Sequence, residues 1–237
     1  MGKHYFITMK QLLLMVLLLV CYTTIIWCQE VKASQIERRN KVAYLRGSNT
    51  PFTGKAVETY KNGNKKSEEN FVNGLKDGFV KTWFENGKIE SQKPYKANKL
   101  EGTVIAWYPN GIVERKVEFS NDKKQGSFQT FHENGKPKEL GQFANGLKTG
   151  IYKSWFENGQ IESEATFVNG KENGTYVEYF ENGKKYCEKK YIAGEEQSTK
   201  YWTESGRQMT IEEVNEMIKK MQSGNLMQQW NQQNQKK

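Results

Sequence analysis

The chain of 237 residues is 36% hydrophobic and 13% aromatic, and its formal net charge is +9. So little aliphatic material excludes a thick core of Leu, Ile and Val, whereas many rings suit a thin sheet in which each ring covers a large area. Lysines alternate with glutamates along the chain, so we interpret most of them as a solvated face, and a basic balance by itself does not predict specific binding to nucleic acid.

Residues 1–33 are predicted to be a secretory signal peptide that is cut after Ala33. Lys3 and Lys10 precede an apolar run over residues 12–28, and the small residue Ala33 follows it. An uncleaved signal anchor is the alternative, because a run of this length lies at the lower limit for spanning a bilayer. Either reading predicts an exported chain, in the periplasm, at the cell surface or secreted, and membrane-anchored if the segment is not cleaved.

Between residues 54 and 206 the sequence repeats every 24 residues. Such self-similarity indicates supersecondary units that stack, because no unit can bury its apolar side alone. Residues 34–53 are predicted to be a degenerate lead-in that caps the first unit. The units open on Gly54, Gly78, Gly102, Gly126, Gly150 and Gly174.

Each unit is predicted to be a β-hairpin. An Asn-Gly pair follows every opening glycine, as at Asn62-Gly63, and predicts a type I′ turn with positive φ at both residues. After it, polarity alternates with period two, which is typical of a half-buried antiparallel strand. A second turn, as at Asn73-Gly74, ends the unit. The sequence therefore predicts an all-β fold, an elongated antiparallel sheet of paired hairpins.

Two sets of large side chains follow from this alternation. One set, which includes Val80, Phe128 and Tyr152, is predicted to form the packed face of the sheet. The residues of the other set stand one position out of phase, so strict alternation places them on the opposite, open face. This ring ladder is the candidate binding site: Trp83, Trp107, Phe131, Trp155, Tyr179 and Trp202.

The C-terminal part is predicted to be a short capping helix over residues 207–224. Thr210 with Glu213 forms a capping box, and an apolar stripe runs from Val214 to Met221. Such a helix would cover the open edge of the last hairpin and end at Gly224. The Gln/Asn-rich tail, residues 225–237, is predicted to be disordered.

The predicted mature chain offers few catalytic groups. Its one histidine, His132, occupies a repeat position that is elsewhere Phe or Tyr, and no Cys/His cluster has metal-ligand spacing. Cys187 is its only cysteine, and we interpret it as an apolar filler. We therefore expect no enzyme, no catalytic or metal-ligating residues, no cofactor and no small-molecule substrate.

The pattern of the unit that opens at Gly78, GFVKTWFENGKIESQKPYKANKLE, resembles the MORN-repeat variant of bacterial proteins, including the family labelled YwqK-like antitoxins. The resemblance covers about residues 42–206. It implies a meander of β-hairpins and a scaffold role at a protein or membrane surface.

Three functions are compatible with these patterns. In the first, an exported, non-enzymatic scaffold holds a partner protein or an envelope surface on the ring ladder. In the second, the ladder stacks on sugars, as in a cell-wall or carbohydrate-binding module. The third is an antitoxin-like protein of a toxin–antitoxin pair. The ladder could also serve only to stabilise the sheet by cross-strand contacts.

Overall fold

The computed structural model describes residues 29–234, with side chains up to residue 224. The predicted leader up to residue 28 and the last three residues of the predicted tail lie outside this part. A short 3₁₀ helix, Ala33–Gln35, lies near the start, and one long helix, α2, spans Ile211–Asn234. The strands are β1 Gln29–Lys32, β2 Ile36–Arg39, β3 Val42–Leu45, β4 Gly54–Thr59, β5 Lys65–Val72, β6 Leu75–Trp83, β7 Ile89–Lys96, β8 Lys99–Leu100, β9 Gly102–Trp107, β10 Val113–Ser120, β11 Lys123–Phe131, β12 Pro137–Ala144, β13 Leu147–Trp155, β14 Ile161–Val168, β15 Lys171–Glu172, β16 Gly174–Tyr179, β17 Lys185–Ile192 and β18 Glu195–Tyr201.

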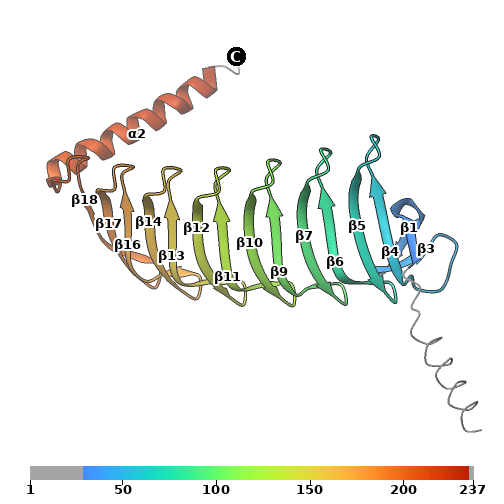
Figure 1. Cartoon of the computed structure of the whole chain (residues 1–237). Coiled ribbons are helices and arrows are strands. Elements are labelled where there is room, and N and C mark those ends of the chain that lie inside the picture. The colour runs from blue at the N-terminus through green and yellow to red at the C-terminus, as the bar shows by residue number, and fades with distance from the viewer. Residues whose placement is uncertain (1–28, 235–237) are drawn as a thin grey trace, which may run out of the picture.

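The hairpins stand side by side and form one long sheet of sixteen strands (Figure 1). From β4 to β18 the sheet follows chain order, and all of these neighbours are antiparallel. The short strands β8 and β15 extend the pairing of β7 and β14. The predicted all-β fold, a row of hairpins in a single antiparallel sheet with a C-terminal helix, is confirmed.

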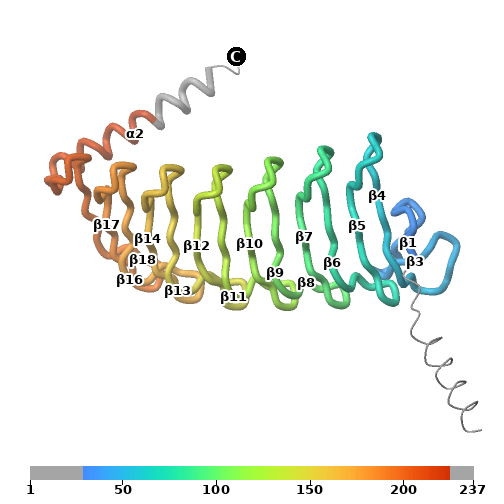
Figure 2. Tube along the Cα trace, viewed as in Figure 1, coloured from blue at the N-terminus to red at the C-terminus, as the bar shows by residue number. Residues whose placement is uncertain are grey.

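The two rows of turns at the ends of the hairpins, which Figure 2 follows along the chain, have different geometries. At Asn62-Gly63 and its equivalents only the glycine has positive φ, and Gly63 N–H donates to Tyr60 O at 3.0 Å. This is a three-residue loop, a type I turn followed by a left-handed glycine, so the predicted type I′ turn is wrong here. The type I′ turn lies in the other row, where Asn73 and Gly74 have φ of 49° and 75° between the paired residues Val72 and Leu75.

The asparagines of the three-residue loops join each unit to the next. The Oδ1 atom of each accepts from the backbone N–H two residues on, at 2.8–3.0 Å, which fixes its own turn. The Nδ2 atom donates to a carbonyl of the following hairpin at 3.0–3.3 Å. One side chain thus satisfies both its own loop and its neighbour's backbone. The six are Asn62, Asn86, Asn110, Asn134, Asn158 and Asn182.

The N-terminal end of the sheet is closed by residues 29–53. The β2–β3 hairpin lies on the first unit, and buried Ile36, Ala43 and Phe52 form a core cluster with Ala56 and Phe71. The lead-in is therefore a packed cap. The cap also includes β1, which pairs in parallel with β4. Residues 29–32 lie before the predicted cleavage position, so a cut after Ala33 would remove a strand of the sheet.

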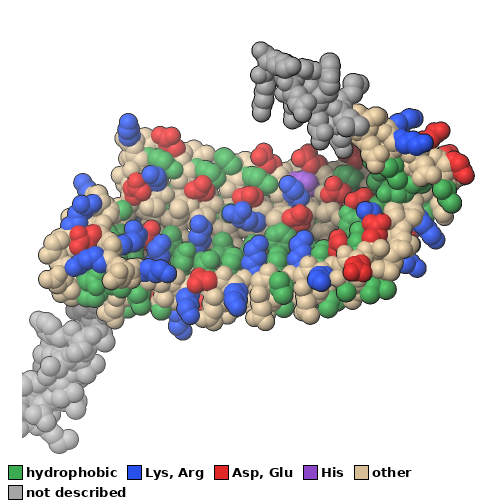
Figure 3. All heavy atoms as spheres, turned by 180° about the vertical axis from the view of Figure 1, so that it is seen from behind, with side chains coloured by type: hydrophobic (Ala, Val, Ile, Leu, Met, Phe, Trp, Pro, Cys, Tyr) green, Lys and Arg blue, Asp and Glu red, His purple; other side chains and the backbone are tan. Residues whose placement is uncertain are grey.

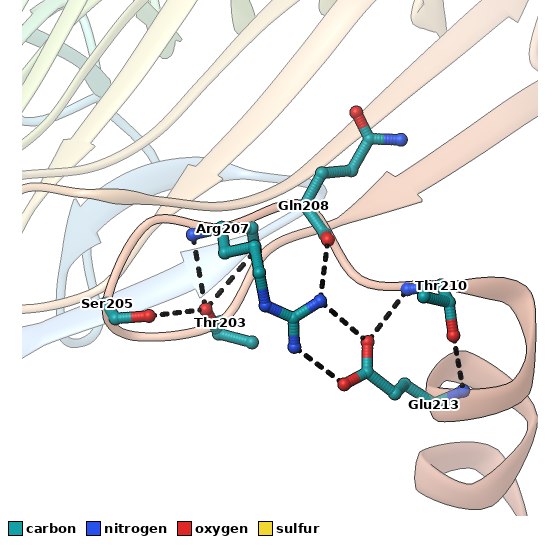
Figure 4. A network of polar contacts seen from close by, with 6 residues as sticks. All are labelled: Thr203, Ser205, Arg207, Gln208, Thr210 and Glu213. Atoms are coloured by element: carbon teal, nitrogen blue, oxygen red, sulfur yellow. Dashed lines mark hydrogen bonds and ion pairs between the residues drawn. The ribbon is translucent and has the colours of Figure 1, made fainter.

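The C-terminal end is built differently. Thr210 caps α2 as predicted, since its Oγ accepts from Glu213 N–H at 3.3 Å and Glu213 Oε2 accepts from Thr210 N–H at 2.8 Å (Figure 4). Arg207 donates to both carboxylate oxygens of Glu213, at 2.6 and 3.1 Å. This network fixes the direction in which α2 leaves the last hairpin.

Two details of the predicted helix are wrong. The helix continues through Gly224 to Asn234, because an isolated glycine weakens a helix by only about 1 kcal/mol and the glutamines that follow are good helix formers, so the predicted disorder of the tail is wrong for residues 225–234. The helix also rises away from the sheet instead of lying on its last strand (Figure 1). Among residues 29–234, no helix is long and apolar enough to cross a membrane.

Candidate binding surfaces

The face of the sheet predicted to be packed carries a continuous row of aromatic contacts. Phe128 and Phe143 lie edge to face with ring centroids 5.8 Å apart, and Tyr152 contacts Phe143 at 6.0 Å and Phe167 at 5.0 Å. Such edge-to-face pairs are favourable geometries for aromatic rings. Residues 29–234 form this long sheet and the small β2–β3 sheet, whose core cluster reaches Phe52, Ala56 and Phe71 and includes none of these rings.

Lysines of the same face lie over these rings. The Nζ atom of Lys124 is 4.8 Å from the centroid of Phe143, and that of Lys148 is 4.6 Å from Tyr152 and 4.8 Å from Phe167. These are cation–π distances. The two lysines stand one repeat apart, so each unit here presents a cation above its pair of rings.

Tyr152 is the most tightly held ring of the row. It faces Gly141, where a Cβ atom would stand 2.4 Å from the ring, so only glycine leaves room for it. The Tyr152 hydroxyl donates to Gln142 O at 2.7 Å. Burial, and then the charge of Glu139, raises the pKa of Tyr152 to about 12. The hydroxyl therefore stays protonated and remains a donor at neutral pH.

The row lines a groove, which we call the aromatic groove and define by Tyr95, Phe119, Phe128, Phe143, Tyr152 and Phe167. Two hollows of about 490 and 440 Å³ share Lys124, Phe128 and Glu139 and together contain all six rings. In the view of Figure 3, hydrophobic side chains gather in a band along the sheet with Lys and Arg side chains among them.

The first of these hollows carries an excess of positive charge. Four cationic side chains and the two carboxylates of Glu114 and Glu139 line it, so its formal charge is positive. In the second hollow the opposite charges balance, with Lys124, Lys148 and Lys153 against three glutamates. The cations of the first are Lys93, Arg115, Lys124 and Lys138.

The six rings of the predicted ladder do not form a continuous surface. All are half-buried, and no aromatic contact joins any two of them within the described residues. Equivalent rings are separated by an intervening strand, so the cross-strand ring contacts considered for the ladder are not made. The structure instead brings together four rings of the groove, Phe128, Phe143, Tyr152 and Phe167, on the face that the sequence indicated only as packing.

A slip in register also interrupts strict alternation at the ladder. Trp83 pairs with Ile89 while its neighbour Thr82 pairs with Ser91, and a similar slip stands beside Trp107, Phe131, Trp155 and Tyr179. Such bulges re-aim side chains. Trp107, Phe131 and Tyr179 accordingly border hollows along the grooved face.

The two outermost ladder rings each lie beside a lysine. Lys65 Nζ is 4.9 Å from the ring centroid of Trp83 and 2.7 Å from Glu68 Oε2. Lys185 makes the same arrangement with Trp202, at 4.8 Å, and with Glu188, at 2.5 Å. These contacts occupy the rings with the protein's own side chains.

The remaining chemistry-bearing residues have structural contacts. The Nε2 atom of His132 lies 2.8 Å from Trp155 O, as the hydroxyls of Tyr60 and Tyr108 lie 2.8 Å from Trp83 O and Phe131 O. His132 thus occupies the position of a tyrosine and reproduces its contact. Cys187 is 1% exposed, and burial, followed by its bond to Glu178, raises the pKa of its thiol to about 12. Within residues 29–234, no cluster of His, Cys, Asp and Glu could hold a metal ion.

A comparison with curated proteins found no similar sequence. A comparison with protein families agrees with the repeat geometry. The family described as MORN repeat variant matches residues 76–97, 100–121, 124–145, 148–169 and 172–193. The structure adds β4–β5 as a further hairpin of the same kind before the first match. Residues 76–193 are therefore five tandem repeats of the MORN-repeat variant family, and they lie inside a longer hairpin array.

Proposed function

We propose that this protein is an exported, non-enzymatic scaffold that binds a segment of a partner protein along the aromatic groove. The family supports a repeat scaffold for interaction with proteins or membranes. The basic and apolar start of the sequence supports export. The observation that carries the proposal is the row of contacting rings Phe128, Phe143, Tyr152 and Phe167, which lies in the hollows of the aromatic groove.

The groove is a better candidate than the ring ladder for physical reasons. Binding energy concentrates where aromatic side chains are contiguous and can be desolvated together. Phe128, Phe143 and Phe167 are half-buried, so each still has area to lose to a partner. The separated ladder rings cannot be covered as one patch.

The charge of the groove indicates the chemistry of the partner. Apolar side chains of the partner would pack on the rings, and its carboxylates would lie near Lys124 and Lys148. Both lysines stand over rings, and within the described side chains neither forms an ion pair at 4.0 Å or less, so the approach of a carboxylate would break no salt bridge there. We therefore expect an extended segment that mixes apolar and acidic residues.

Photocrosslinking in cells tests this function. A photoreactive phenylalanine analogue would replace Phe128 or Phe167 in the groove, and Ile151, which is 60% exposed and lies one position out of phase with Tyr152, would be the control. We expect one common protein adduct from both groove positions and none from Ile151. Adducts from Ile151, or from Trp155 and not from the groove positions, would contradict binding of the partner along the aromatic groove.

Charge reversal tests the chemistry of the partner separately. Lys124→Glu with Lys148→Glu is expected to reduce the adduct yield several-fold, since it places carboxylates opposite carboxylates. Lys116→Glu, an exposed position paired with Ile105, is the matched control and should leave the yield unchanged. Equal loss in both variants would contradict an acidic segment, and adducts to glycan alone would favour the carbohydrate-binding alternative.

A further inference from the structure

The apolar stripe of α2 is left open by the rest of the described chain. Ile211, Ile218 and Met221 are 76%, 40% and 52% exposed. Only Val214 and Met217 are half-buried, and the Met217 sulfur lies 4.0 Å from the Tyr186 hydroxyl at the end of the sheet. A helix of this kind gains its stability mainly from packing of its apolar face, so the open stripe needs a partner.

The stripe follows the spacing of a helix pair. With Ile211 as position a of a heptad, Val214 falls on d, Ile218 on a and Met221 on d. Apolar residues at a and d form the seam of a two-stranded coiled coil. Met217 falls on the flanking g position, which is the side that contacts the sheet.

Every charge of this stretch lies away from the seam. The glutamates and lysines between residues 211 and 224 occupy only the outer b, c and f positions, and the flanking e and g positions are uncharged. A seam that carries apolar residues only, without flanking charges, fits another seam of the same kind. The outer charges are Glu212, Glu213, Glu216, Lys219 and Lys220.

The stretch is also complementary to itself when two copies run in opposite directions. About a two-fold axis at residue 216, Ile211 meets Met221 and Val214 meets Ile218, so apolar residues face apolar residues. The same axis brings Glu212 to the level and the side of Lys219 of the second copy, whereas in a parallel pair the glutamates of the two copies share one level. An isologous contact of this type is what two-fold symmetry requires.

We propose that two copies of this chain associate through α2, as an antiparallel helix pair centred near residue 216. The bidentate contact between Arg207 and Glu213 holds the helix away from the sheet, so the seam is presented outward. The two sheets then lie at opposite ends of the helix pair. The scaffold is bivalent, with one aromatic groove in each copy.

Light scattering of the full chain, purified in a mild detergent, tests the association. We expect the mass of a dimer at micromolar concentration. Ile218→Glu is expected to raise the dissociation constant at least about tenfold by burying a charge in the seam. Ser223→Glu adds the same charge on the outer face and should leave the mass unchanged. A monomer at every concentration, or a dimer that persists with Ile218→Glu, would overturn the proposal.

Crosslinking tests the orientation and does not depend on a disruptive substitution. In a chain with Cys21 and Cys28 replaced by serine, Ile211→Cys mixed with Met221→Cys is expected to give an intermolecular disulfide. Either variant alone should give little, because equal positions lie far apart in an antiparallel pair. A disulfide from Ile211→Cys alone would overturn the antiparallel arrangement.

Discussion

The two ends of the sheet differ in how far the chain's own residues cover them. At the N-terminal end, residues before the first unit fold back on it and bury Ala43 and Phe52 to 1% and 4% exposure. At the C-terminal end, α2 departs after one cap, and Ile211, at its first turn, remains 76% exposed. A repeat array needs its terminal units closed. The difference shows that the described residues close one end of the sheet and leave the apolar stripe of the helix at the other end exposed.

The largest loss of stability is expected when a buried side chain is removed from the core of the N-terminal cap. Phe52→Ala removes a ring that packs at 6.0 Å from Phe71, and the free energy of unfolding should fall by about 3–5 kcal/mol. Chemical denaturation followed by circular dichroism measures this. Ile218→Ala, measured at a concentration where the chain is monomeric, should change the free energy of unfolding little. A similar loss in both variants would mean that the C-terminal end is also closed within the monomer.

Two glycines at equivalent turn positions allow the effect of cap packing on stability to be separated from the effect of backbone strain. Gly74 and Gly146 occupy the same turn position with φ of 75° and 85°, so alanine costs about 1–2 kcal/mol at either site. A Cβ at Gly74 would also stand 2.3 Å from Val42 Cγ1 and 2.8 Å from Ala43 O, whereas Gly146 has nothing within 4 Å.

Gly74→Ala should therefore destabilise the chain by about 1–3 kcal/mol more than Gly146→Ala, because only the first overpacks the cap. The midpoints of urea unfolding compare the two variants directly. Equal midpoints would show that the β2–β3 hairpin does not pack tightly on the first turn.

A smaller effect is expected from removing β1. Deletion of residues 29–32 takes away the parallel strand on β4 and the packing of Val31 against the core cluster, at about 2 kcal/mol. Thermal unfolding of the two chain lengths measures this loss. The same comparison bears on processing, because we expect the exported chain to keep β1 and to show an N-terminus before Gln29 by mass spectrometry. An N-terminus at Ser34 with undiminished stability would contradict both expectations.

The smallest effect is expected on the helical content of α2 when the pH is lowered. The hydrogen bonds from Arg207, and then the backbone bond to Thr210, lower the pKa of Glu213 to about 2. The carboxylate therefore supports the start of α2 above its ordinary pKa of 4.5, and this support is lost as the pH falls from 4.5 towards 2.

Helical circular dichroism should decrease over that range in the natural chain. Arg207→Gln should shift the decrease to higher pH, because the pKa of Glu213 then returns towards its ordinary value. An unchanged titration in the variant would show that the contact does not hold the helix.

The repeat itself could be read from the sequence because a few residue types mark every hairpin. Glycines at a fixed spacing locate the turns, and alternation after them assigns the strands. The type of each turn could not be read in the same way. Asn-Gly suits both loops, and the difference depends on whether two or three residues separate the paired positions, as at Val72–Leu75 and Tyr60–Asn64.

The candidate site was harder to predict than the fold. Alternation shows which side of a strand is apolar, as at Phe128 and Tyr152, but not whether another layer covers that side. The bulges beside Trp83 and Trp155 were also hidden, because one extra residue in a strand leaves no mark in composition. Strand β1 could not be predicted, because its four residues directly follow an apolar run that is typical of a signal peptide.

The asparagine contacts between hairpins make this protein modular in length. Each Nδ2 finds its acceptor one unit further on, so a copy of 24 residues inserted in phase would receive and donate the same bonds as its neighbours. Since strands in a sheet are about 4.8 Å apart, each added unit would extend the array by about 9.6 Å. The number of units therefore sets the length of the sheet. Because one asparagine side chain connects each unit to the next, that length can be redesigned without a new interface.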